Sequence, residues 1–191
     1  MSRYILFNKP DGVVSTFTDA AQRKTLKDYI PFPEIYAAGR LDRDSEGLLL
    51  LTDDGELIHQ VTDPNSGHTK TYLAQVEGVL SSDAIAHLQN GVRLKDYTTR
   101  PVRVEVIGEP VGLPPKVRPV TPHGPTAWLK LELTEGKKHQ IRHMTAAVGL
   151  PTLRLIRVAI GPIQLGDLPS REWRDMTRWE VARLRSWRAD Q

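Results

Sequence analysis

The chain is organised around residues 37–55, which read AAGRLDRDSEGLLLLTDDG. The approach through 35–38 has the pattern of a short strand, and the apolar run 48–51 is typical of a strand buried on both faces. Between these two segments lies a polar loop that Gly39 and Gly47 bracket. The pattern therefore predicts a polar loop held between two rigid strands, where functional residues often gather.

Asp42 stands at the centre of this loop, between Arg40 and Arg43. In an arbitrary protein, a carboxylate between two arginines is most simply a salt-bridged loop residue. Asp44 follows two residues later, so the two acids can be read as a glycosidase-like pair. Nothing else in the sequence indicates a carbohydrate groove, and we interpret Asp44 as a hydrogen-bond acceptor within the loop.

Composition places the chain among ordinary soluble proteins of one domain, or one domain in two lobes. It has 191 residues, of which 39% are hydrophobic and 26% charged. No apolar run is long enough for a membrane span, and the first residues lead into a strand pattern without a signal-peptide region. We therefore expect a cytoplasmic protein. The absence of cysteine excludes disulfides and thiolate chemistry.

Positive charge is concentrated in the second part of the chain, although the formal net charge is only +3. Residues 1–110 carry 12 Lys and Arg against 16 Asp and Glu, whereas residues 111–191 carry 14 against 7. This asymmetry indicates a polyanionic partner that binds mostly through one side. A solvated basic surface is the simpler alternative.

Short strands and helices alternate along the rest of the chain. We expect further strands at 4–7, 13–17, 69–76, 102–107, 128–133, 153–160 and 163–165. Helices are expected at 25–30, 56–61, 81–90 and 137–148, with Asp53 as the cap of the second. The Pro- and Gly-rich residues 108–125 predict a long surface loop.

A basic cluster opens the expected helix 137–148. It consists of Lys137, Lys138, His139, Arg142 and His143. Cations at a helix N-terminus oppose the helix dipole, so the cluster calls for an anion such as phosphate. His139 and His143 have the i, i+4 spacing of a metal site, but Gln140 replaces the metalloprotease glutamate and no third ligand is evident. We expect no metal.

Three short motifs lie far apart from one another along the chain. They are Gly-Arg-Leu-Asp at 39–42 with its Gly-Leu-Leu strand and Asp-Asp-Gly turn, Lys-x-Tyr at 70–72, and Glu-Gly-x-x-x-Gln-Ile-Arg at 135–142. With this set the chain resembles the bacterial ribosomal pseudouridine synthases that modify 16S and 23S RNA. Lys-Pro-x-Gly at 9–12 looks like the first motif of that family, although spacing alone favours a hairpin turn with an incidental lysine.

The resemblance implies an α+β fold, with a mixed, mainly antiparallel sheet in two lobes, helices on its faces and a central RNA-binding cleft. It makes residues 1–172 the catalytic domain and residues 173–191 a basic C-terminal tail. The chain starts directly on the catalytic region, without an N-terminal RNA-binding domain, which points to a large-subunit subgroup. The implied function is isomerisation of a specific uridine in 23S ribosomal RNA to pseudouridine, by a monomer without cofactor, metal or membrane.

The resemblance also assigns residues to roles. Asp42 acts on the ribose as nucleophile or base, Tyr72 stacks on the target base, and Arg142 pairs with Asp42. Substrate binding falls to Arg40, Arg43, Lys70, Lys137, Lys138, His139, Gln140 and Ile141. Without the resemblance, Tyr72 is simply a sheet-face aromatic and Lys70 a structural or phosphate-binding charge.

Two further expectations concern the RNA backbone and an alternative function. Lys116 and Arg118 of the long loop, with Arg183, Arg185 and Arg188 of the tail, are expected to contact the RNA backbone. The alternative function is a non-catalytic ribosomal-RNA-binding or ribosome assembly factor. Such a factor needs lysines and arginines but gains nothing from a carboxylate at Asp42 beside phosphate.

Overall fold

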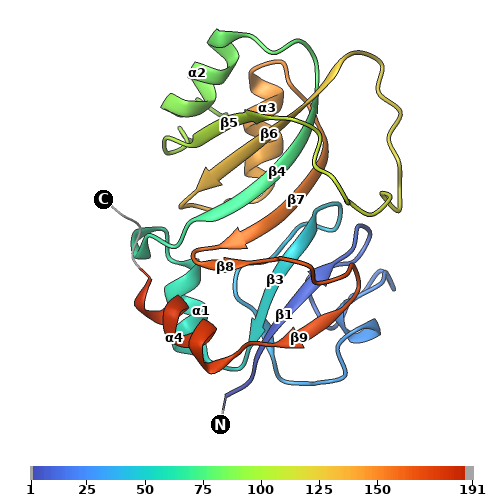
Figure 1. Cartoon of the computed structure of the whole chain (residues 1–191), viewed down its shortest axis with the longest axis vertical. Coiled ribbons are helices and arrows are strands. Elements are labelled where there is room, and N and C mark those ends of the chain that lie inside the picture. Colours follow the sequence, from blue (N-terminus) through green and yellow to red (C-terminus); the bar gives the residue numbers. More distant parts are fainter. Residues whose placement is uncertain (1, 188–191) are drawn as a thin grey trace.

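The computed structural model describes residues 2–187 (Figure 1). Its strands are β1 Tyr4–Lys9, β2 Tyr36–Ala37, β3 Glu46–Thr52, β4 Lys70–Glu77, β5 Arg103–Ile107, β6 Thr126–Leu133, β7 Thr152–Ile160, β8 Ile163–Gln164 and β9 Trp173–Asp175. Its helices are α1 Gly55–Thr62, α2 Ser82–Asn90, α3 Gln140–Ala147 and α4 Arg178–Ser186, with 3₁₀ turns at Leu26–Asp28 and Pro64–Ser66.

One nine-stranded sheet runs through the described residues in the order β5-β6-β4-β7-β3-β1-β9, with β2 paired to β3 and β8 to β7. All of these pairings are antiparallel except β3 with β7. The upper lobe in Figure 1 holds β4, β5 and β6 with α2 and α3, and the lower lobe holds β1, β3 and β9 with α1 and α4. The expected fold class is confirmed.

Each lobe has its own hydrophobic core. In the upper lobe, α2 and α3 pack Leu88 and Met144 against the inner face of β4 to β6. In the lower lobe, β1 and β3 are buried on both faces, because α1 and α4 cover one face and residues 10–45 cover the other. Leu48, Leu49, Leu50 and Leu51 are each at most 1% exposed. Burial of each such side chain contributes about 1.5–3 kcal/mol, which explains why the apolar run predicts this strand correctly.

The two lobes join where β3 meets β7. Only two register pairs connect these strands, Glu46 with Ile156 and Gly47 with Arg157. Glu46 also accepts a bidentate ion pair from Arg154 at 2.8 and 2.9 Å, and this pair is buried. Arg157 donates from Nε to the carbonyl of Leu48 at 2.8 Å. The loop at 39–46 therefore leads directly into the junction of the lobes.

Several expected elements differ in detail. Residues 13–17 form no strand, because only Val14 and Thr16 make backbone hydrogen bonds, to Lys24 and Leu26. The cap of α1 is Asp54 rather than Asp53, since its carboxylate accepts from the Leu57 N–H. The helix expected at 137–148 begins only at Gln140.

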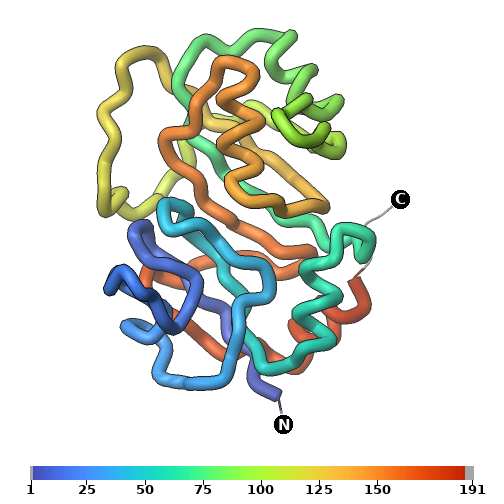
Figure 2. Tube along the Cα trace, turned by 180° about the vertical axis from the view of Figure 1, so that it is seen from behind, coloured from blue at the N-terminus to red at the C-terminus, as the bar shows by residue number. Residues whose placement is uncertain are grey.

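Residues 173–187 are an integral part of the lower lobe. Trp173–Asp175 pairs with β1 as an edge strand, and Leu184 of α4 is buried in the lower core. Figures 1 and 2 both place α4 beside α1. Arg185 pairs with Asp54, the cap of α1, so it is engaged inside the fold. The expected RNA contact of Arg188 lies outside the described residues.

No helix among residues 2–187 is long and apolar enough to cross a membrane.

Candidate active site

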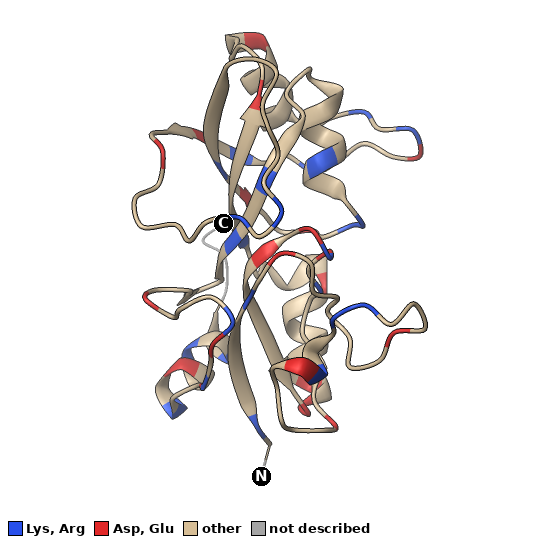
Figure 3. Cartoon of the chain, turned by 90° about the vertical axis from the view of Figure 1, so that its right-hand side faces the viewer, with Lys and Arg blue, Asp and Glu red and all other residues tan. Residues whose placement is uncertain are grey.

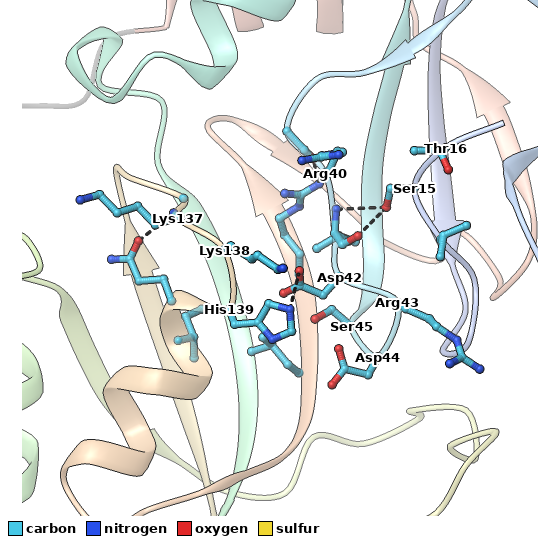
Figure 4. Close-up of a pocket in the computed structure, with 18 of the residues that line it drawn as sticks. Ser15, Thr16, Arg40, Asp42, Arg43, Asp44, Ser45, Lys137, Lys138 and His139 are labelled. Carbon is cyan, nitrogen blue, oxygen red and sulfur yellow. Dashed lines mark hydrogen bonds and ion pairs between the residues drawn. The ribbon is translucent and has the colours of Figure 1, made fainter. Parts of the chain in front are cut away.

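The loop at 39–46 faces a cavity between the two lobes, and its backbone is held from the lower lobe. Ser15 Oγ donates to the carbonyl of Leu41 at 2.6 Å and accepts from the Leu41 N–H at 3.1 Å (Figure 4). The Gly12 N–H donates to the carbonyl of Arg43 at 2.8 Å. These contacts fix the backbone on both sides of Asp42.

Lys9 is part of this support and is not incidental. Its side chain is fully buried, and its ammonium group donates to the carbonyls of Pro10 at 3.0 Å, Val13 at 2.8 Å and Arg43 at 3.4 Å. Burial lowers the pKa of Lys9 to about 7, although nearby carboxylates oppose the shift. The Lys-Pro-x-Gly turn therefore braces the loop, which spacing alone did not indicate.

The central cavity has a volume of about 980 Å³, within the range of ligand sites. Ten of the residues expected at the site line it: Arg40, Asp42, Arg43, Lys70, Tyr72, Lys137, Lys138, His139, Gln140 and Ile141. They come from the loop at 39–46, from β4, and from the turn and first residues of α3. Figure 3 shows charged residues of both signs at the middle of the molecule, where the two lobes meet.

Arg142 is the one expected site residue that is not among the residues lining the cavity. It also does not pair with Asp42 as expected. Its Nη2 lies 3.1 Å from the Asp44 carboxylate and donates to the Asp44 carbonyl at 2.9 Å, and its Nη1 donates to the carbonyl of Thr152 at 3.1 Å. The side chain projects from α3 toward the end of the loop and toward β7. Arg142 thus ties together three segments beside the cavity, and Asp44 is the loop hydrogen-bond acceptor that its sequence position indicated.

The side chain that faces Asp42 is His139. The distance from His139 Nε2 to Asp42 Oδ1 is 3.5 Å, and Figure 4 shows the two side chains facing each other across the cavity. Arg43 points away from Asp42 in the same view, and its Nε donates to the carbonyl of Gly12. Asp42 is about one-third exposed, so its carboxylate is open to a ligand.

His139 owes its position to a basic turn, residues 136–139, that precedes α3. His139 has a left-handed backbone with φ of 54°, which is strained for a residue with a side chain and prevents the helix from extending further back. Gln140 is buried and holds the turn, since its amide donates to Glu135 at 2.6 Å and its carbonyl oxygen accepts from the Lys137 N–H at 3.0 Å. The Glu-Gly-x-x-x-Gln part of the motif thus has a structural cause.

The lysines of the basic turn have different environments. Lys137 lies over the ring of Tyr97, with its ammonium 3.4 Å from the ring centroid. Lys138 is exposed at the cavity rim. The expected helix-dipole argument does not apply to either residue, because both precede the first turn of α3.

Tyr72 and Lys70 lie two residues apart on β4, and both line the cavity. Tyr72 is half-buried and packs on both neighbouring cores, while its hydroxyl makes no hydrogen bond to residues 2–187. Lys70 is buried and donates to the carbonyl of Val61 at 2.7 Å. Burial, together with the charge of Arg157, lowers the pKa of Lys70 to about 8.

This shift in pKa makes a prediction for stability. Lys70 loses its proton near pH 8 in the folded chain and near pH 10.5 when unfolded, so the unfolded chain binds more protons between these values. The free energy of unfolding of the parent should therefore rise with pH relative to that of a Lys70→Met variant. The full shift corresponds to on the order of 3 kcal/mol. Denaturant unfolding of both proteins across this range measures the difference; parallel pH curves would contradict it.

Sequence reasoning missed Arg157, which lines the cavity from β7. Its side chain is 2% exposed, and its Nη2 donates to the carbonyl of Gly39 at 2.8 Å. The only available signal was that two arginines, Arg154 and Arg157, stand among apolar residues in the expected strand 153–160. Ser15 was missed for a similar reason, because only the tertiary structure brings it to Leu41.

The long loop at 108–125 is tied to the rest of the protein by the residues expected to bind RNA. Arg118 makes a bidentate ion pair with the buried carboxylate of Asp11, at 2.5 and 3.0 Å. Lys116 donates to the carbonyl of Leu153 at 2.6 Å, and Arg154 donates to that of Pro114. Both charges therefore have partners within the protein, but the Arg118 side chain is 45% exposed and lines the central cavity, so its contact with RNA backbone stays a prediction.

His139 and His143 stack with ring centroids 6.0 Å apart. Within residues 2–187, no group of three or more His, Cys, Asp or Glu side chains gathers in a way that holds a metal ion.

The sequence is similar to a known protein family and to several named proteins. A family model described as RNA pseudouridylate synthase matches residues 3–147. Ribosomal large subunit pseudouridine synthase E of Vibrio parahaemolyticus is 48% identical over 91% of this chain and 74% of its own length. The protein of the same name from Xanthomonas axonopodis pv. citri is 51% identical over 86% of this chain and 88% of its own length.

The fold has a close counterpart among solved structures. A crystal structure of a pseudouridylate synthase superposes with a TM-score of 0.81 at 29% identity, covering 96% of this chain and 74% of that one.

Proposed function

Because this chain belongs to the RNA pseudouridylate synthase family, we propose that it isomerises a uridine of large-subunit (23S) ribosomal RNA to pseudouridine. The family membership makes it an isomerase and confirms the resemblance drawn from the three motifs. The large-subunit substrate is supported by the names of the two relatives that share about half of their residues with it. A cytoplasmic location follows from that substrate as part of the proposal.

The observation that carries the proposal is the placement of Asp42 and Tyr72 in one cavity. In the reaction, the bond from ribose C1′ to uracil N1 breaks and a bond from C1′ to C5 forms. C5 loses a proton and N1 gains one, so no atom is added or lost overall. Asp42 is the group we assign to the ribose, where a carboxylate either attacks the sugar or removes a proton from it.

The other residues receive supporting roles. Tyr72 presents its ring to a base that has been flipped out of its helix, and Ile141 gives that base an apolar neighbour. Arg40 and Lys138, both exposed at the cavity, are suited to RNA phosphates. Arg142 and Gln140 position the loop at 39–46 and the basic turn, as their hydrogen bonds indicate.

The non-catalytic alternative has no specific observation in its favour. A binding or assembly factor has no use for a carboxylate exposed in a cavity with Arg40, Lys138 and His139 around it, since that charge repels phosphate.

The test is a map of pseudouridine across ribosomal RNA from cells that lack this protein. One position in the large-subunit RNA should lose its pseudouridine and regain it when the parent protein is restored. Restoration with Asp42→Asn should leave that position as uridine. A complete set of pseudouridines in the deletion cells would contradict the proposal.

Tyr72 provides a second test of the site. Tyr72→Phe should keep most of the RNA affinity and turnover, because the ring is retained and the hydroxyl has no hydrogen bond within residues 2–187. Tyr72→Ala should slow single turnover by roughly fivefold to a hundredfold, the effect of losing about 1–3 kcal/mol of stacking. If the alanine variant turned over at the parental rate, Tyr72 would be only a sheet-face aromatic.

A further inference from the structure

Two buried cations share one corner of the central cavity. Lys70 of β4 is 5% exposed and Arg157 of β7 is 2% exposed, and both line the cavity. β4 and β7 are neighbouring antiparallel strands in which Tyr72 lies opposite Arg157. Directly opposed residues of an antiparallel pair project to the same face, so Arg157 emerges beside the ring of Tyr72. Lys70 emerges on that face two residues before Tyr72.

Neither cation lies within ion-pair distance of a carboxylate among residues 2–187, and the charge of Asp63 acts on Lys70 only from further away. Lys70 donates only to the Val61 carbonyl, and Arg157 donates only to the carbonyls of Leu48 and Gly39. Arg154, on the same strand as Arg157, is by contrast neutralised by Glu46. A buried charge without a counter-charge is costly, so the pair is suited to an anion from outside the chain.

The corner also has room beside the guanidinium. Arg157 Nη1 makes no hydrogen bond within the described chain, and it lies 3.8 Å from the position that a side chain on Gly39 would occupy. Gly39 has a left-handed φ of +83° and leaves that position empty. Lys70, Gly39 and Arg40 all line this cavity.

We propose that Lys70 and Arg157 form a phosphate-binding subsite, which takes the phosphodiester group adjoining the nucleotide whose base lies on Tyr72. An ammonium group and a guanidinium group together match the charge and the oxygen atoms of a phosphate. The identity of that nucleotide rests on the proposed function. The subsite itself rests on the buried cations, and it is tested separately from turnover.

Inorganic phosphate serves as the probe. The melting temperature of the parent should rise with phosphate concentration at constant ionic strength, since a ligand that binds the folded state stabilises it. Uridine 5′-monophosphate should act in the same way, and uridine much less. Lys70→Met, which keeps the length of the side chain, should weaken the apparent affinity for phosphate about tenfold or more.

Lys95→Met is the matched control, because it removes an exposed lysine that does not line the cavity. Its affinity for phosphate should stay within about threefold of the parent, as expected of a solvated charge. Arg157→Lys is a second variant that keeps the charge but loses the planar fork, and it should also bind phosphate more weakly.

The outcomes separate the subsite from the proposed function. Parental phosphate affinity in both Lys70→Met and Arg157→Lys, or an equal loss in Lys95→Met, would overturn the subsite. Either result leaves the function intact if Asp42→Asn still abolishes conversion. Conversely, loss of phosphate binding in the two corner variants supports the subsite even if no uridine is converted.

Discussion

The Asp42→Asn protein should bind its RNA and convert no uridine. Asparagine keeps the shape of the side chain but can neither attack the ribose nor accept its proton, so turnover should fall by at least about 10³-fold. RNA affinity should be similar or tighter, because a negative charge is removed from a cavity that will contain phosphate. Single-turnover conversion and filter binding of a large-subunit RNA fragment measure the two quantities.

The structure indicates that this variant will fold. Asp42 is about one-third exposed, and within residues 2–187 its carboxylate pairs only with His139 at 3.5 Å, so its replacement leaves no buried arginine without a partner. Arg142 keeps its partner in this variant, because it pairs with Asp44 and not with Asp42. The backbone contact from the Ser45 N–H to the Asp42 carbonyl is unaffected.

Asp44→Asn is the matched control from the same loop. Its carboxylate lies against Arg142, and the Asp44 carbonyl that also accepts from Arg142 is retained. Conversion should remain within about tenfold of the parent, the effect of weakening one partly exposed ion pair. A folded Asp42→Asn protein that converts uridine at the parental rate would remove the catalytic assignment and return the choice to a binding factor.

The second large effect is expected at the junction of the lobes. Gly47→Ala should destabilise the protein by about 4 kcal/mol or more, since the change introduces strain and a clash in a buried sheet. A Cβ at Gly47 would lie 2.2 Å from the Arg157 carbonyl oxygen, and the φ of +99° is unfavourable for alanine. Neither backbone can retreat without breaking the two register pairs that connect β3 to β7.

Gly55→Ala is the control for this change. Gly55 begins α1, and a Cβ there would meet nothing within 4 Å, so the variant should differ from the parent by no more than about 1 kcal/mol. Denaturant unfolding of the three proteins gives the comparison. Equal midpoints for Gly47→Ala and the parent would show that the lobes are not held together at this close approach.

The junction also explains how the site is supported. Gly47 and Glu46 follow the loop that carries Asp42, and their partners Arg157 and Arg154 lie on β7. The contacts that join the lobes therefore also set the distance between the loop and the basic turn. Strain at Gly47 should disturb the cavity even where the protein remains folded.

Local patterns in the sequence determined much of this protein. The apolar run at 48–51 predicted β3, because a strand covered on both faces needs side chains that leave water favourably. Ser81 or Ser82 was the expected cap of α2, and it is the Ser81 hydroxyl that accepts from the Ala84 N–H. The three motifs identified the family. Through it they predicted that Asp42 and Tyr72 face one cleft, and both residues line the central cavity. Each of these features follows either from residues that are close in the sequence or from motifs that the family shares.

The partners of the charged side chains were decided only by the tertiary structure. Arg142 meets Asp44 from 98 residues away, and Arg157 reaches Gly39 across 118 residues. Lys9 is buried because the loop at 39–46 folds over it, and residues 173–187 join the lower lobe because β1 leaves an edge that β9 pairs with. An ionic side chain can extend several ångströms toward any of several neighbours. Which one it meets depends on how distant strands pack, and no local period of the sequence records that arrangement.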